Sequence, residues 1–366
     1  MKKKILKIII ILLVILALIA GIAIFALKSF YENNLKTVNT EEQSQTIVVE
    51  ITSGMGTEKI ADLLEEKKVI RNSFCFKVYV KLNEINNLQA GKYEFENGKD
   101  DVKSIVQKLS NGDVMDETVK LTLIEGKSIT DYAKVIAEKT NNTEEDVYNL
   151  LEDEEYLDSL IEKYWFITDE IKNEEIYYSL EGYLRPDTYI FENKDVSVEY
   201  IFSYILNYTD KLLTKYKDDI ELNRLTVHQI LTIASIVELE GNSDEDRAGI
   251  AGVFFNRINS KMPLGSDVTT YYAFGVNMGE SDLTKEQINT YNPYNTRHKD
   301  MGGKIPVGAI CSPSESSIKA VLYPTETDAY YFVSDKYGNA YFTENYADHQ
   351  KIIQELKDKD LWYVYE

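Results

Sequence analysis

The N-terminal part of the chain separates sharply into a basic start and an apolar run. Four lysines lie within the first seven residues, and Ile8–Leu27 then holds 20 residues without a charged or strongly polar side chain. That length matches the hydrocarbon core of a bilayer, and the lysines before it predict a cytoplasmic N-terminus. The alternative is a cleaved signal peptide, whose apolar region is usually about 7–15 residues long. We expect residues 1–28 to form a cytoplasmic stub and an uncleaved membrane helix.

A polar stretch and then an alternating pattern follow the apolar run. Residues 29–45 have the composition of a linker. The next segment gives, in order, a strand pattern, two helical patterns, a second strand and a third helix, which predicts a small α+β module over residues 46–114. These elements are expected at about 47–52, 60–68, 73–82, 90–95 and 101–109.

The remaining residues, 115–366, predict a larger α+β domain. Residues 140–178 are acidic and helical in pattern, and residues 329–342 resemble a hairpin followed by a closing helix at about 346–357. All six prolines lie between Pro186 and Pro324, so this half of the chain has the rigid, turn-rich loops on which sites tend to be built.

One helical segment, Leu225–Gly241, carries a candidate catalytic carboxyl. Thr226 and Gln229 predict a capping box at its start, and Gly241 predicts a left-handed residue at its end. At about 100° per residue, Glu238 falls near the middle of an apolar stripe. An apolar wall desolvates a carboxyl and raises its pKa, which is what a general acid needs. The alternative is that the last turn reaches water and Glu238 is merely solvated.

Composition narrows the classes of function. The net charge of −21 argues against binding nucleic acid, whose phosphates would be repelled. Three scattered histidines and two distant cysteines do not have the spacing of a metal site, so we expect no metal. Whether Cys75 and Cys311 pair is left open. The chain has no glycine-rich phosphate loop.

Six motifs of the C-terminal half occur in one register. They are Leu180-Glu-Gly-Tyr-Leu-Arg-Pro-Asp-Thr-Tyr189, Ala234-Ser-Ile-Val-Glu-Leu-Glu240 with the later Arg247 and Val253–Arg257, Leu264–Thr269, Tyr294–Thr296, Pro306–Ile310 and Ala329–Val333. Together they resemble the MltG (YceG-like) family of endolytic murein transglycosylases. The resemblance implies a membrane-anchored lyase with a LysM-like module, which cuts peptidoglycan glycan strands and needs no cofactor. Peptidoglycan synthases are candidate partners.

The resemblance also implies site residues. The catalytic glutamate of the Ala-Ser-Ile-Val-Glu motif corresponds to Glu238. Glu240, which projects to another side of the helix, is interpreted as structural. The residues of loop motifs expected to face the cleft, or else to serve as turn ties, are Ser266, Asp267, Tyr294, Asn295 and Thr296. Glu181 and Asp187 are either site carboxylates or, in the favoured interpretation, loop ties.

Three positions depart from the family pattern, and two alternatives compete with it. Val268 replaces a usual proline, Ala340 a common histidine and Arg185 a frequent aromatic residue. A lytic transglycosylase can work with one carboxyl, because the C6 hydroxyl of the muramyl sugar attacks intramolecularly. A hydrolase would need a second carboxylate, such as Asp267. The other alternative is a catalytically silent scaffold that binds cell-wall glycan.

Overall fold

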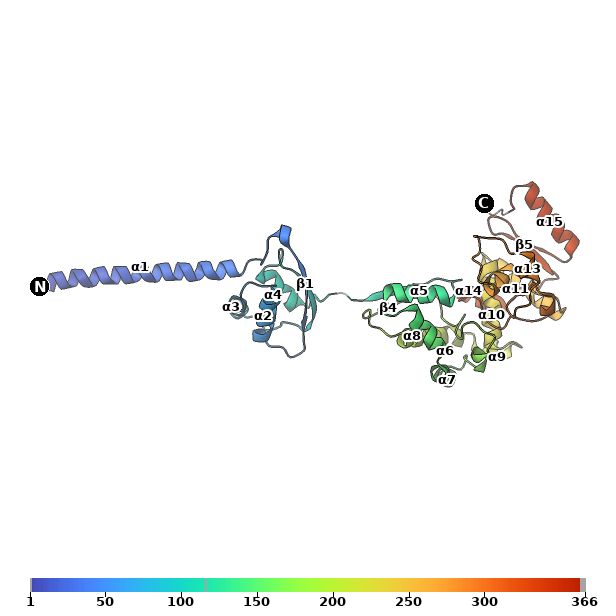
Figure 1. The fold of residues 1–366 in the computed structure, drawn as a ribbon, viewed down its shortest axis with the longest axis horizontal. Coiled ribbons are helices and arrows are strands. Elements are labelled where there is room, and N and C mark those ends of the chain that lie inside the picture. Colours follow the sequence, from blue (N-terminus) through green and yellow to red (C-terminus); the bar gives the residue numbers. More distant parts are fainter. Residues whose placement is uncertain (1, 116, 363–366) are drawn as a thin grey trace. The chain divides into compact units, whose positions relative to one another are not determined.

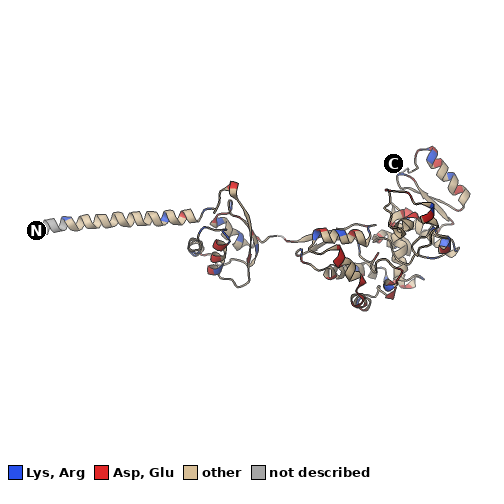
Figure 2. Ribbon diagram, in the orientation of Figure 1, with Lys and Arg blue, Asp and Glu red and all other residues tan. Residues whose placement is uncertain are grey.

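The computed structural model describes residues 2–115 and 117–362, which fall into two compact units, Met1–Asp116 and Glu117–Glu366 (Figure 1). The first unit begins with helix α1, Lys2–Asn34. Its apolar side chains are exposed, and from Lys7 onward the helix is long and apolar enough to cross a membrane. Figure 2 shows the stretch between Lys7 and Lys28 free of charged side chains.

The rest of the first unit has the predicted order of elements. Strands β1 (Thr46–Ile51) and β2 (Gly91–Glu96) pair antiparallel, from Thr46 opposite Glu96 to Ile51 opposite Gly91. Alternate strand residues, including Tyr93 and Phe95, are buried beneath the helices. Those helices are α2 (Thr57–Glu66), α3 (Ser73–Leu82) and α4 (Val102–Asn111). The α+β prediction is confirmed for this unit.

The segment expected to be a free linker is partly helical and partly bound to the module. Helix α1 continues six residues beyond the predicted end at residue 28. After it, the Leu35 carbonyl accepts a hydrogen bond from Val102 N at 3.0 Å, and Arg71 Nε donates to the Thr37 carbonyl at 2.7 Å. The segment that follows α1 is therefore tied to the module by backbone acceptors.

The second unit is mainly helical and contains two small antiparallel sheets. Strand β3 (Val119–Leu123) pairs with β4 (Asp187–Phe191), and β5 (Tyr331–Ser334) pairs with β6 (Ala340–Thr343), the predicted hairpin. The α-helices are α5 (Ile129–Lys139), α6 (Glu144–Glu152), α7 (Glu154–Lys163), α8 (Val198–Thr214), α9 (Lys217–Leu222), α10 (Val227–Glu240), α11 (Asp244–Asn259), α12 (Asp267–Ala273), α13 (Lys285–Asn289), α14 (Glu315–Leu322) and α15 (Tyr346–Asp358).

Helix α10 lies at the centre of the second unit and is buried on every side. Each residue from Ile230 to Val237 is at most 1% exposed, and α11, α12 and α14 pack against the helix. The predicted capping box is present, with Thr226 and Gln229 each accepting the other's backbone N–H at 3.2 Å. The apolar stripe inferred from the sequence is therefore one part of a surface that is apolar all round.

Gly241 ends α10 for a different reason from the one predicted. Its φ of −107° is extended, not left-handed. A Cβ at this position would lie 2.7 Å from Arg247 Cγ, so only glycine lets the start of α11 approach so closely. The two helices are thus joined by a tight connection directly behind the last carboxyl of α10.

The separate core of the first unit generates a stability prediction. Leu64 is fully buried there, so Leu64→Ala should cost about 2–5 kcal/mol. Leu82→Ala, at a side chain that is 70% exposed, is the control and should cost about 0.5 kcal/mol or less. Native-state hydrogen exchange of the full chain should show faster exchange in α2 and β2 for Leu64→Ala, with α10 unaffected. Equal loss of protection in α10 would show that the two units do not unfold separately.

Candidate active site

The Glu238 carboxyl lies among hydrogen-bond donors, and not against the apolar wall expected from periodicity. Its Oε2 accepts bonds from Ser314 N at 2.8 Å, Ser314 Oγ at 2.5 Å and Ser317 Oγ at 2.7 Å. Arg247 Nη2 lies 3.4 Å from Oε1, and the Glu238 side chain is only 7% exposed. Buried carboxyls with this many donors are held in place by them. Glu238 therefore joins the end of α10 to α11 and α14.

Glu240 has the environment that the sequence interpretation assigned to Glu238. Its Oε1 accepts a hydrogen bond from Ser266 Oγ at 2.5 Å. Burial of the carboxyl raises its pKa to about 7, an effect that the Ser266 bond opposes and the charge of Asp267 increases. The residue nevertheless keeps part of its surface accessible. A carboxyl of this kind can hold a proton near neutral pH.

Ser266 is held in position by two buried threonines. Ser266 N donates to Thr296 Oγ1 at 3.1 Å, and the Thr296 and Thr269 hydroxyls lie 2.8 Å apart. Gly265 N donates to the Thr296 carbonyl at 3.0 Å. All three side chains of this cluster are at most 2% exposed. Thr296 thus supports Ser266 from behind, and Ser266 contacts the Glu240 carboxyl directly.

The other predicted loop residues divide into one at the surface and two in the interior. Asp267 is exposed at the start of α12 and forms an ion pair with Arg297 at 2.7 Å. Asn295 is fully buried, and its amide ties the chain by donating to the carbonyl of Thr290 at 2.7 Å. Tyr294 is also fully buried. The structure therefore brings Ser266 and Asp267 to Glu240, whereas Asn295 and Tyr294 have the contacts of loop ties.

The two carboxyls of the Leu180–Tyr189 motif lie in different environments. Glu181 is 2% exposed and accepts a hydrogen bond from Ile129 N. Asp187 is exposed on β4 and lies 3.7 Å from Arg185, the residue that replaces a frequent aromatic side chain. Both carboxyls therefore make the contacts of loop ties.

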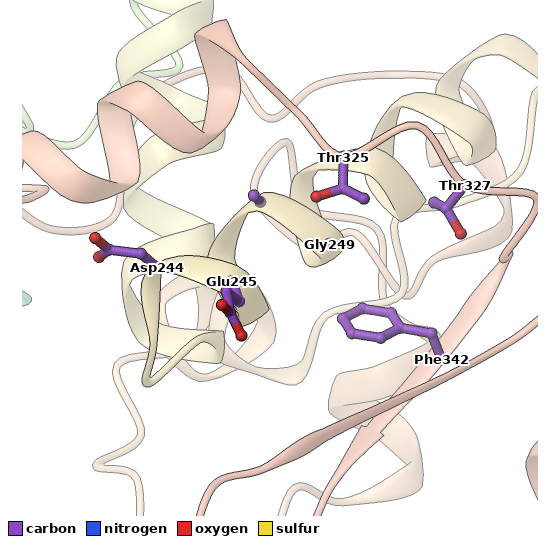
Figure 3. A pocket seen from close by; sticks show the side chains of 7 residues that line it. Asp244, Glu245, Gly249, Thr325, Thr327 and Phe342 are labelled. Carbon is purple, nitrogen blue, oxygen red and sulfur yellow. The ribbon is translucent and has the colours of Figure 1, made fainter.

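Two cavities in the second unit lie away from these carboxyls. One, of about 440 Å³, lies beside α11, where Gly249 faces the ring of Phe342 and Asp244 and Glu245 form one rim (Figure 3). The other, of about 410 Å³, borders His228. The His228 ring nitrogens lie 2.9 Å from Tyr183 Oη and 2.8 Å from the Val307 carbonyl oxygen, so this histidine is a structural tie.

The described residues do not include a cluster with the composition of a metal site. Over residues 2–115 and 117–362, His, Cys, Asp and Glu side chains do not gather in a group of three or more that could hold a metal ion. Cys75 and Cys311 are buried free thiols, one in each unit.

A carboxyl whose burial raises its pKa to about 7 has the property that a general acid requires. The model of the YceG-like family matches residues 49–355, and the chain belongs to this family.

Named relatives and a solved structure agree with this assignment. The chain is 34% identical over 322 residues to an endolytic murein transglycosylase of Bacillus subtilis, covering 88% of each. It is 31% identical over 325 residues to one of Streptococcus pneumoniae, covering 84% of this chain and 58% of that protein. A crystal structure of a YceG-like protein from Listeria monocytogenes matches with a TM-score of 0.60 at 35% identity, covering 85% of this chain and all of that one.

The raised pKa of Glu240 predicts a pH dependence of stability. The folded state keeps this proton up to about pH 7, whereas the unfolded chain loses it near 4.5. The free energy of unfolding therefore falls as pH rises from 4.5 to 7, by about 1.4 kcal/mol per pH unit for one proton. Glu240→Gln should remove that part of the slope.

Chemical denaturation at several pH values measures the effect. Glu245→Gln, at an exposed side chain of α11, controls for the loss of one charge. An unchanged slope between pH 4.5 and 7 in Glu240→Gln would contradict the protonated state of this carboxyl.

Proposed function

We propose that this chain cleaves the glycan strands of peptidoglycan endolytically as a lytic transglycosylase, with Glu240 as general acid and then general base. The names of its relatives support the reaction class. The observation that supports Glu240 as the acid is its desolvated carboxyl, which is bonded to Ser266 Oγ on a residue that is partly exposed.

The reaction needs one proton donor that later becomes an acceptor. Protonated Glu240 gives its proton to the bridging oxygen between N-acetylmuramic acid and N-acetylglucosamine, and the glycosidic bond breaks. The resulting carboxylate takes the proton of the C6 hydroxyl, whose oxygen closes a 1,6-anhydro ring on the anomeric carbon. Water is not consumed, and the intramolecular nucleophile supplies the high effective concentration. After the two half-reactions Glu240 is protonated again, as it was at the start.

Ser266 and Asp267 have supporting parts in this proposal. Ser266 Oγ stabilises the carboxylate that exists between the two proton transfers, by the bond it already makes to Oε1. Asp267 raises the pKa of Glu240 through its negative charge. Arg297, paired with Asp267, lies at the same exposed edge and can contact a substrate.

Glu238 is the competing assignment for the acid, made from the sequence motif. Ser314 N, Ser314 Oγ and Ser317 Oγ all donate to its Oε2, and Arg247 lies beside its Oε1. Those contacts fix the carboxyl in place and tie the end of α10 to α14. We therefore assign Glu238 a positioning role and Glu240 the proton transfer.

The N-terminal unit extends the proposal to attachment and orientation. The lysines before α1 predict a cytoplasmic N-terminus, with residues 29–366 outside. The β1-α2-α3-β2 order, with its antiparallel pair, supports a LysM-like module that holds glycan. Glycan strands, and synthases at the same membrane face, would then be its partners.

Replacing each carboxyl in turn by an amide shows whether Glu240 or Glu238 is the acid. Glu240→Gln should lower kcat on uncrosslinked murein strands by about 10²–10⁴-fold, because a general acid contributes that much. Glu238→Gln should chiefly lower the thermal midpoint of unfolding. The Glu238→Gln protein that remains folded should keep more of the wild-type kcat than Glu240→Gln does. The measurement is single-turnover release of anhydro-ended fragments. The reverse pattern would return the acid to Glu238.

The fate of solvent oxygen separates the lyase from a hydrolase. In ¹⁸O water the new muramic ends should carry no label, because the C6 oxygen closes the ring. Labelled reducing ends would make the chain a hydrolase, which would require a second carboxylate, such as Asp267. Strands bound but left uncut would favour a scaffold.

Protease accessibility checks the orientation. Protease added to intact protoplasts should digest the bulk of the chain and leave a short fragment that contains α1. Resistance of the full-length chain would contradict the proposed topology, and a mature N-terminus near Ser29 would show a cleaved signal peptide instead.

A further inference from the structure

Glu181 is a buried carboxyl that the proposed proton transfers do not use. Its two oxygens lie 3.1 and 3.0 Å from Ile129 N, and Tyr272 Oη donates to Oε2 at 3.3 Å. One contact is with the first residue of α5, and the other is with α12. Glu181 thus joins two helices that start in different parts of the sequence.

The contact of Glu181 with α5 lies beside a loop that packs against the end of α10, where both candidate carboxyls lie. The loop before α5 contains Gly126, whose backbone N donates to the Ser312 carbonyl at 3.0 Å. A Cβ on Gly126 would lie 3.2 Å from Leu239 Cδ2 and 3.8 Å from Glu238 Cγ. The loop therefore packs against the last turn of α10, and the tie at Ile129 fixes where that loop ends.

The contact of Glu181 with α12 is connected to Ser266, the hydrogen-bond partner of Glu240. Helix α12 begins directly after Ser266. The ring of Tyr272 packs against those of Tyr177 and Tyr294, with centroids 5.7 and 5.0 Å apart. Tyr294 lies two residues before Thr296, whose hydroxyl accepts from Ser266 N. Glu181 is thus linked on this side, through packed rings and one helix, to the serine that contacts Glu240.

We propose that Glu181 is a positioning residue for this reaction, because it ties the start of α5 and the last turn of α12 together beside the end of α10 and so sets Ser266 against Glu240. This inference rests on the proposed function. It names a group that does not touch the substrate and that acts through the geometry of Ser266.

The protonation state of Glu181 gives the role a measurable signature. Burial raises the pKa of this carboxyl to about 8, and the negative charge of Asp131 on α5 adds to the effect. The other ionisable groups that face it are Tyr132, Tyr178, Tyr272, Tyr294 and Cys311. Above pH 8 an ionised Glu181 would keep both donors but would carry a charge in a buried site, and the water drawn in to solvate that charge would disturb the packed rings of Tyr272 and Tyr294.

A pH profile of the intact enzyme tests the signature. Log kcat/KM of the wild type should fall with slope −1 above pH 7, as Glu240 ionises, and with slope −2 above pH 8. Glu181→Gln, which cannot ionise, should keep slope −1 throughout. Glu181→Ala should lower kcat by about 10–100-fold with little change in KM, because a small misplacement costs that much. Glu181→Gln should keep most of the kcat that Glu181→Ala loses.

Hydrogen exchange gives a readout that needs no activity. Glu181→Ala should speed exchange at residues 126–133 and 266–273 and leave α15 unchanged, whereas Glu181→Gln should leave all three segments near the wild-type rate. Tyr272→Phe removes only the contact with α12 and should speed exchange at 266–273 alone. Uniform acceleration, or slope −2 retained in Glu181→Gln, would overturn the inference. Glycan left uncut by a wild type with the expected exchange pattern would instead overturn the proposed function.

Discussion

The hydrogen bond between Ser266 Oγ and the Glu240 carboxyl, at 2.5 Å in a desolvated setting, is the interaction on which the site depends. Glu240 is the last residue of a helix that is buried on every side. Its position at the negative end of the helix dipole also disfavours an extra negative charge. The loop before α12 supplies a hydrogen-bond donor to this carboxyl, because the Thr269–Thr296 pair holds Ser266 in position beside it.

Glu238 and Glu240 lie only two residues apart, but the fold places their carboxyls in different environments. Glu238 faces α14, where serine donors and Arg247 satisfy its oxygens. Glu240 faces the loop before α12 and has one donor, with burial raising its pKa to about 7. Environments that separate two neighbouring carboxyls in this way commonly separate an acid from a fixed charge in catalytic sites. In the proposed mechanism, the same division gives a central helix that is anchored through Glu238 and carries the proposed acid at its end.

Much of this arrangement could be predicted from the sequence. Local patterns predicted the apolar run, the strand and helix order of the first unit, the capping box at Thr226 and the hairpin at the C-terminal end. Such patterns depend on residues close together in the sequence, so the folded chain keeps them. The loop motif at Ser266 and Asp267, which the resemblance implies faces the cleft, contacts Glu240 through Ser266 in the structure.

The choice of carboxyl could not be made from angles along one helix. Periodicity distinguishes two faces only when one of them meets water, and α10 meets none between Ile230 and Val237. The mainly apolar sequence of that stretch was the available signal, since a helix apolar all round is buried all round. Which carboxyl then meets donors depends on Ser314 and Ser317, about 75 residues further along the chain, and only the tertiary fold brings those residues to Glu238.

The protonation of Glu240 can be observed directly. A ¹³C NMR titration of the carboxyl carbons, with the Glu240 signal assigned by its loss in Glu240→Gln, would follow this group through neutral pH. The account predicts a midpoint near 7 for Glu240. A midpoint near the ordinary value of about 4.3 would contradict it, because a carboxyl ionised at neutral pH could not serve as the proton donor.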